Sequence, residues 1–168
     1  MSYRSPDCYS VAVASPFLPE KEEIKRRLEG RYVGSVPHNR ALGLSVHNYR
    51  PEHLSLCLPY REDLVGNPET RVLHGGCITS LIDATCGGAV ILSLVAPRRI
   101  ATLDLRIDYV RPAIPDQDVI CDAHCYKITR NVAFVRASAH HGDDANPIAT
   151  ASGTFVVFSD DAAPGANP

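Results

Sequence analysis

The sequence predicts an α+β domain in which an antiparallel sheet curves around one long apolar helix. The stretch from Ile78 to Ala96 is the most apolar of the chain and has the length of a buried helix. Segments with the composition of strands follow it at short spacing, which favours antiparallel pairing. A helix this apolar needs cover on most of its surface. We therefore expect the sheet to wrap it and another subunit to pair with the remaining face.

The N-terminal region differs in composition from the rest of the chain. Its first 18 residues show no periodicity and lack the long apolar run behind a basic start that marks a signal peptide. Pro19 opens a segment with acidic residues first, basic residues late and Gly30 at its end, which is typical of a short surface helix. Ile24 and Leu28 would dock this helix. We expect residues 1–40 to form an arm and a short helix.

Residues 41–159 are expected to form one domain. Two strands are predicted between Leu42 and Tyr60, with a turn near Arg50-Pro51-Glu52. The segment LVGNPETRVLHGG follows, and its Gly, Asn, Pro and Thr residues indicate a loop. The long helix is predicted from about residue 75 to residue 95, because Pro97 disfavours helix at the residue before it.

The C-terminal third is predicted to be β, starting with an alternating strand over 100–109. One face is expected to carry Leu103, Leu105, Ile107 and Tyr109, and the other Thr102, Asp104, Arg106 and Asp108. Further strands are predicted at Asp118–Ile128, Val132–His140 and Ile148–Phe158. The tail, residues 160–168, is expected to be disordered.

Composition and charge exclude several classes of protein. The chain is 45% hydrophobic and 21% charged, which suits a soluble globular domain. Its net charge of -2 gives no basic field for nucleic acid. Asp83 interrupts the apolar stretch, which argues against a membrane span. The six cysteines lack the spacing of a metal site, and we expect them to be reduced in a cytoplasmic protein without metal.

The first candidate site is the start of the long helix, at His74-Gly75-Gly76. A helix N-terminus carries unpaired N–H groups and the positive end of the helix dipole. Glycine allows a ligand to approach the backbone closely. Together these features suit an oxyanion site for a polarised carbonyl. The alternative is that the two glycines only form a tight turn.

The second candidate is Asp83, within the sequence ITSLIDATCGG of the apolar helix. Aspartate is a poor residue for the middle of a helix and is rarely buried without a partner. It could act as a general base on water or as a nucleophile. Alternatively, it could point to solvent or bind a nearby hydroxyl such as that of Thr79.

Other polar residues carry less information. Asn67 could orient a water molecule or stabilise a turn, and Thr102 could be a simple strand former. Arg111 and Arg130 lie at predicted strand ends and could be solubilising charges. The G-x-S-x-G motif is absent, which excludes serine hydrolases of the lipase kind.

Taken together, these motifs resemble those of the PaaI-like hotdog thioesterases. The pattern comprises Asn67, HGG seven residues later, Asp83, the strand TLDLRIDYVRPA and the final strand IATASGTF. The resemblance runs from about Leu42 to Phe158. It implies a hotdog fold, with six antiparallel strands around a central helix. It also implies a homodimer, commonly doubled to a homotetramer, with active sites at the subunit interface.

The resemblance also implies a role for each motif residue. The Gly75 N–H binds the thioester carbonyl, Asp83 of the facing subunit drives hydrolysis, and His74 fixes the loop. Asn67 and Thr102 orient substrate and water. The resemblance further implies that coenzyme A is bound by a strand edge, a hairpin and the second glycine of HGG. These residues are Tyr109, Arg111 and Pro112 at the strand edge, Thr129, Arg130 and Asn131 in the hairpin, and Gly76. Arg71 and Asp116 depart from the pattern, because the family often has glycine at both places.

The sequence therefore predicts an acyl-CoA thioesterase that needs neither metal nor cofactor. Two alternatives stay open. One is a hotdog hydratase, although only His74 suits the base that such an enzyme needs. The other is a non-catalytic acyl-CoA-binding protein that kept the fold and lost turnover.

Overall fold

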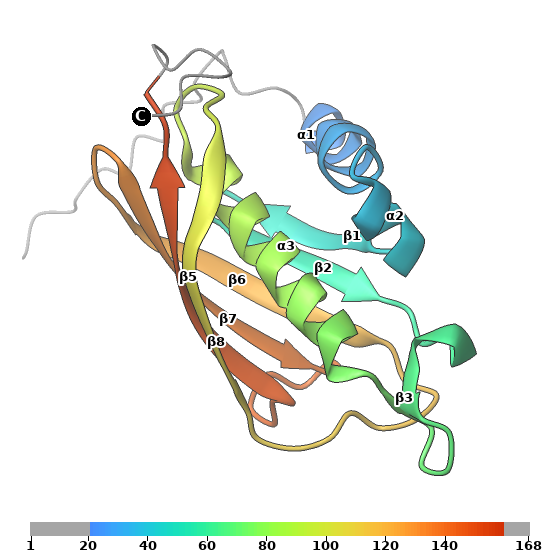
Figure 1. Ribbon diagram of the computed structural model, residues 1–168. Helices are drawn as coiled ribbons and strands as arrows, with labels where there is room; N and C mark the ends of the chain where they lie inside the picture. Colours follow the sequence, from blue (N-terminus) through green and yellow to red (C-terminus); the bar gives the residue numbers. More distant parts are fainter. Residues whose placement is uncertain (1–20, 160–168) are drawn as a thin grey trace, which may run out of the picture.

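The computed structural model describes residues 21–159. The predicted arm, Pro19 and the C-terminal tail lie outside this range. Within it, a six-stranded antiparallel sheet curves behind one long helix, α3, while α1 and α2 lie to one side of that helix (Figure 1). The predicted α+β class is confirmed.

The sheet has the strand order β1-β2-β6-β7-β8-β5, and every neighbouring pair is antiparallel. The predicted strands are confirmed to within a few residues at their ends. Their bounds are β1 Ser45–Arg50, β2 His53–Leu58, β5 Ile100–Tyr109, β6 Val119–Ile128, β7 Val132–His140 and β8 Ala149–Val157. Because β5 forms one edge, its outer backbone groups have no neighbouring strand within the described chain.

The N-terminal helix is confirmed, but it does not end at Gly30. Helix α1, Lys21–Arg27, continues as a π-helical segment, η1, Leu28–Val33. A short helix that the sequence analysis did not anticipate follows, α2, Pro37–Leu42. Its boundaries have ordinary causes, because Pro37 occupies the first turn and Gly43 ends the helix with a φ of 73°. Leu28 is buried as predicted.

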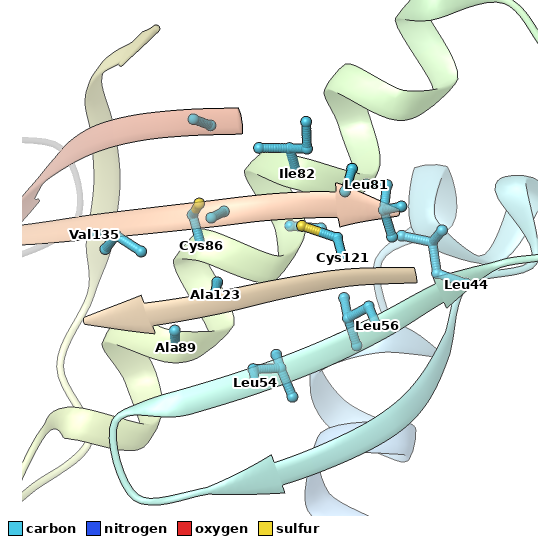
Figure 2. Close-up of a cluster of buried hydrophobic side chains, with 14 of the residues drawn as sticks. Leu44, Leu54, Leu56, Leu81, Ile82, Cys86, Ala89, Cys121, Ala123 and Val135 are labelled. Carbon is cyan, nitrogen blue, oxygen red and sulfur yellow. The ribbon is translucent and has the colours of Figure 1, made fainter. Parts of the chain in front are cut away.

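Helix α3 spans Gly75–Ser93, two residues shorter than predicted, because Leu94 is already extended. It packs across the sheet with its apolar side chains facing the inner sides of β2, β6 and β7 (Figure 2). The core residues labelled there are Leu44, Leu54, Leu56, Leu81, Ile82, Cys86, Ala89, Cys121, Ala123 and Val135. By length and composition α3 could cross a membrane, but its burial here identifies it as the central core helix.

Two glycines in the middle of α3 allow the elements on either side of it to approach closely. A Cβ atom at Gly87 would lie 2.8 Å from the Tyr32 hydroxyl oxygen. One at Gly88 would overlap a Leu54 methyl carbon. Glycine inside a helix costs about 1 kcal/mol relative to alanine. Here it is required because Tyr32 of η1 and Leu54 of β2 occupy the space of a side chain.

Strand β5 contains a bulge, which makes one of the predicted strand faces wrong. Thr102 pairs with Phe155 and Asp104 with Thr154, so Leu103 is the extra residue. An inserted residue reverses the alternation on one side of the bulge. Consequently Thr102 faces α3, on the same side as Leu105 and Ile107, and Leu103 is 60% exposed.

The cysteines from Cys57 onward are unpaired thiols in the described part of the chain. Burial raises the pKa of the Cys121 thiol to about 12 and raises that of Cys86 well above its usual range. These two thiols are therefore protonated and inert core residues. Cys8 lies outside the described residues.

Candidate active site

The start of α3 has one backbone N–H that is bonded and one that is not. His74 is extended, with φ -63° and ψ 130°, and its Nδ1 accepts a hydrogen bond from the Gly76 N–H at 2.9 Å. Within residues 21–159, the Gly75 N–H has no acceptor. His74 thus caps the helix, and the Gly75 N–H is available as a hydrogen-bond donor.

Tyr109 holds this helix start against the end of β5. Its hydroxyl donates to the Gly75 carbonyl oxygen at 2.7 Å and lies 3.0 Å from the Thr79 hydroxyl. The Tyr109 side chain is 47% exposed. The predicted substrate-binding residue Tyr109 and the predicted oxyanion donor Gly75 are therefore neighbours.

Asp83 lies two turns further along α3 and is half-buried. The Thr102 hydroxyl donates to its Oδ1 at 2.8 Å. On the other side, a hollow of about 230 Å³ opens between α3 and α2. Its lining comprises Tyr32, Val36, His38, Asn39, Ser80, Asp83 and Ala84. The carboxylate thus has one fixed partner and open space beside it.

Removing the Thr102 hydroxyl tests whether this contact orients Asp83. Thr102→Val should lower kcat at least about tenfold and change KM little, because a hydrogen bond to a charged group contributes roughly 1.5–3 kcal/mol. Thr102→Ser keeps the hydroxyl and should stay near the wild-type rate. A loss in Thr102→Ser with near-normal turnover in Thr102→Val would show that the methyl group, and not the hydroxyl, matters.

Three residues beside Asp83 were missed from the sequence. Ser80 Oγ donates to the Gly76 carbonyl oxygen and lies 3.0 Å from His38 Nε2, which joins α2 to the start of α3. The Tyr32 hydroxyl donates to the Ala84 carbonyl oxygen at 2.5 Å. Burial, followed by the nearby Asp83 charge, raises the pKa of Tyr32. Ser80 lies three residues before Asp83, but nothing in the sequence indicates the approach of His38 or Tyr32.

The loop before His74 is held by an ion pair between the two residues that replace family glycines. Arg71 and Asp116 both have left-handed backbones, with φ 57° and φ 63°. The Arg71 guanidinium donates to both Asp116 carboxylate oxygens, at 2.8 and 3.0 Å, and also to Glu62. These carboxylates raise the pKa of Arg71. The substitutions therefore retain the glycine-like backbone and connect the loop to the β5–β6 connection.

The left-handed backbone gives Arg71 a direct stability test. Arg71→Gly and Arg71→Ala both remove the ion pair, but only glycine adopts this φ without a Cβ clash. We expect the Gly variant to melt about 2–4 °C above the Ala variant in calorimetry. If the Ala variant melts at the same temperature or higher, residue 71 does not have the left-handed conformation.

The contacts of Asn67 are those of a turn. Its Oδ1 accepts from the Glu69 N–H at 2.9 Å, and its carbonyl oxygen accepts from the Arg71 N–H at 2.7 Å. Asn67 ends the short strand β3, Val65–Asn67, which pairs with β4, Val72–Leu73. Of the two roles considered for Asn67, the turn is the one for which the structure shows contacts.

The predicted coenzyme A residues fall into two groups at opposite ends of the sheet. Tyr109 pairs with Ala149, near the start of α3, and Arg111 bonds Asn146 in the adjacent β7–β8 turn. Pro112 follows Arg111 directly. The hairpin of Thr129, Arg130 and Asn131 joins β6 to β7 at the far end, where Val132 pairs with Val156. Thr102 of β5 lies near this hairpin. It pairs with Phe155 of β8, and Phe155 pairs on its other side with Ala133, two residues after Asn131.

One chain therefore carries two separate halves of the predicted site. Gly75, Tyr109, Arg111 and Pro112 form one half, and Asp83, Thr102 and the 129–131 hairpin lie toward the other. Gly75 and Asp83 are eight residues apart on one helix, about 12 Å along its axis. That separation is too large for both groups to act on one carbonyl within one chain.

The sheet wrapped around α3 defines the hotdog class of fold. The chain belongs to the thioesterase superfamily, whose family model matches residues 71–148. It is 30% identical over 139 residues to a medium/long-chain acyl-CoA thioesterase, YigI, of Salmonella typhimurium, with 75% of this chain and 88% of the relative covered. The YigI of Escherichia coli K12 is 29% identical over the same length and coverage.

Solved structures agree with this assignment. A Pseudomonas aeruginosa protein is 42% identical, with a TM-score of 0.72, and covers 79% of this chain and 98% of its own. A mutant of the phenylacetic acid degradation protein PaaI from Thermus thermophilus is 24% identical, with a TM-score of 0.63, over 73% of this chain and 99% of its own. The PaaI structure shows the shared fold, and the predicted PaaI-like hotdog fold is confirmed.

Proposed function

We propose that the protein hydrolyses acyl-CoA thioesters to the free acid and coenzyme A. The observation that carries this function is the Gly75 N–H, which has no acceptor within residues 21–159 at the start of a 19-residue helix. Such a donor stabilises negative charge on a carbonyl oxygen. Asp83, with Thr102 on one of its oxygens and a hollow beside it, supplies the base.

The active site is formed by two copies of the chain. Gly75 comes from one protomer and Asp83 from its partner, since about 12 Å of helix separates them within a chain. The free edge of β5, where Leu103 is 60% exposed, provides a surface for the second copy together with Val110, which directly follows the strand and is 59% exposed. A homodimer is the minimal active form, and pairing of dimers would give a homotetramer.

In the reaction, Asp83 takes a proton from water as the water oxygen attacks the thioester carbon. The carbonyl oxygen becomes an oxyanion that accepts the hydrogen bond of the Gly75 N–H. When the C–S bond breaks, the thiolate of coenzyme A leaves and takes the proton from Asp83. All steps use side chains, backbone and water, so no metal or cofactor enters the reaction.

The substrates are medium- or long-chain acyl-CoAs, the class that the names of the YigI relatives state for those proteins. Coenzyme A is bound by Gly76, Tyr109, Arg111 and Pro112 of one protomer and by the 129–131 hairpin of the other. Because the Gly76 N–H is bonded to His74, Gly76 contributes its lack of a side chain to this site.

A hydratase fits the geometry less well. Its reaction needs a histidine base, and His74 is the histidine at the helix start. The His74 Nδ1 accepts from the Gly76 N–H, so that nitrogen is already used as a helix cap. A binding protein without turnover remains the alternative from another class, and hydrolysis assays separate the two.

The direct test is release of free thiol from acyl-CoAs of different chain lengths, followed by a thiol reagent. Thiol release in excess of the protein concentration supports an enzyme. Tight binding of the same compounds without thiol release would support the binding protein.

Mixing two inactive variants tests the two-chain site. Gly75→Pro and Asp83→Asn protomers, unfolded and refolded together, should form mixed dimers with one intact site each. Random pairing would restore up to about a quarter of wild-type activity. Each variant refolded alone is the control and should stay inactive. Failure of mixed samples that demonstrably contain heterodimers would place both groups in one chain.

A further inference from the structure

An apolar groove of about 360 Å³ lies between α1 and the C-terminal part of α3. Most of its walls are aliphatic, with Ile24 and Leu28 on one side and Ile91, Leu92, Leu94 and Val95 on the other. Val95 is fully exposed and Ile91 is 37% exposed. Arg27 is the single charged residue in the lining, so the groove suits a hydrocarbon better than a polar ligand.

The groove lies further along the same side of α3 as Asp83. Asp83, Gly87 and Ile91 are spaced four residues apart, so they lie on one stripe of α3. From Asp83 to Ile91 this stripe is about 12 Å long. A chain that starts at the thioester carbon beside Asp83 and follows α3 toward its C-terminus therefore reaches the groove.

Tyr32 stands on this path. It lines both the hollow beside Asp83 and the groove. Its hydroxyl binds the Ala84 carbonyl oxygen at 2.5 Å, and it occupies the space that a side chain at Gly87 would need. The two openings are thus separated by one half-buried aromatic side chain.

We propose that this groove receives the distal part of the substrate's acyl chain, with Tyr32 at its entrance. The inference rests on the proposed thioesterase function and adds to it a binding site for the acyl chain. Short acyl groups end before Tyr32, whereas longer chains extend past its ring toward Ile91 and Val95. Each methylene buried in the groove can raise kcat/KM up to about fourfold, since burial contributes about 0.8 kcal/mol per CH₂.

The test compares kcat/KM for butyryl-, octanoyl-, dodecanoyl- and hexadecanoyl-CoA in the wild type and in Ile91→Asp. A carboxylate in the groove should lower kcat/KM for the two longest substrates at least about tenfold and leave butyryl-CoA within about twofold. Tyr126→Asp is the control, because Tyr126 is also exposed but lies beside Phe134 and Arg136 on the sheet. It should keep the wild-type profile.

A second variant, Tyr32→Ala, should increase the preference for long acyl chains. Tyr32→Ala opens the entrance and should raise the ratio of kcat/KM for hexadecanoyl-CoA to that for butyryl-CoA. This ratio does not depend on how much of the variant is folded, so a loss of stability cannot imitate the result.

Failure of the groove to bind the acyl chain and failure of the thioesterase function would give different results. If the wild type hydrolyses acyl-CoAs but Ile91→Asp affects all chain lengths equally or none, the acyl chain lies elsewhere and the thioesterase function stands. An unchanged length ratio in Tyr32→Ala would remove Tyr32 from the path. A wild-type protein that hydrolyses none of the four substrates overturns the function, and the inference with it.

Discussion

Asp83→Asn should lower turnover by on the order of 10²–10⁴, with a much smaller change in KM. The substitution keeps the size and shape of the side chain, and the asparagine oxygen can still accept from the Thr102 hydroxyl. What it removes is the ability to take a proton from water. The measurement is steady-state hydrolysis of one acyl-CoA over a range of concentrations.

A matched control separates this effect from a general loss of charge. Glu52→Gln also converts a carboxylate to an amide, in the exposed turn between β1 and β2, and should leave kcat unchanged. Near-normal turnover in Asp83→Asn would remove Asp83 from the chemistry. A single turnover in ¹⁸O-labelled water distinguishes base from nucleophile. A general base directs the label into the product acid, whereas a nucleophile whose anhydride with the acyl group is hydrolysed at the Asp83 carbonyl carbon takes the label into its own carboxylate.

Most of the fold could be predicted because its elements have strong local patterns. The length and apolar character of α3, and the alternation of β6, β7 and β8, depend only on neighbouring residues and so are visible in the sequence. The short helix α2 was missed, although Pro37 and Gly43 mark its ends. Six residues carry too little periodicity to distinguish a helix from a loop.

Local sequence patterns did not predict several contacts of the candidate site. The alternation of β5 placed Thr102 on the wrong face, because a bulge has no reliable sequence pattern of its own and depends on pairing with β8. Gly87 and Gly88 were visible, but the reason for them is the approach of Tyr32 and Leu54, which are remote in sequence. Contacts of this kind depend on tertiary packing.

Arg71 and Asp116 illustrate the same limit. Each stands where the family often has glycine. The structure places them in one ion pair with left-handed backbones on both sides. Their relationship could not be seen from the sequence, since 45 residues separate them.

The second large effect is expected at Gly75, where the backbone N–H is the proposed oxyanion donor. Proline is the one substitution that deletes this group, and the local structure accepts it. Gly75 is the first residue of α3, where proline is tolerated. His74 has a ψ of 130°, which is the conformation that a residue before proline prefers. The Gly75 N–H donates to no acceptor within residues 21–159, so no bond of the fold is lost.

Gly75→Pro should therefore lower kcat at least about 10²-fold, because one oxyanion donor contributes about 2.7–4 kcal/mol to the transition state. Gly75→Ala is the matched control. It keeps the N–H, and its Cβ would lie at an ordinary 3.6 Å from the Tyr109 hydroxyl oxygen, so turnover should stay near wild type. Acyl-CoA affinity, measured on the same preparations, should fall far less than kcat in the Pro variant, since a neutral hydrogen bond contributes only roughly 0.5–1.5 kcal/mol. Small and equal losses of affinity and turnover would mean that Gly75 only shapes the turn, and the binding protein would then be the better description of this chain.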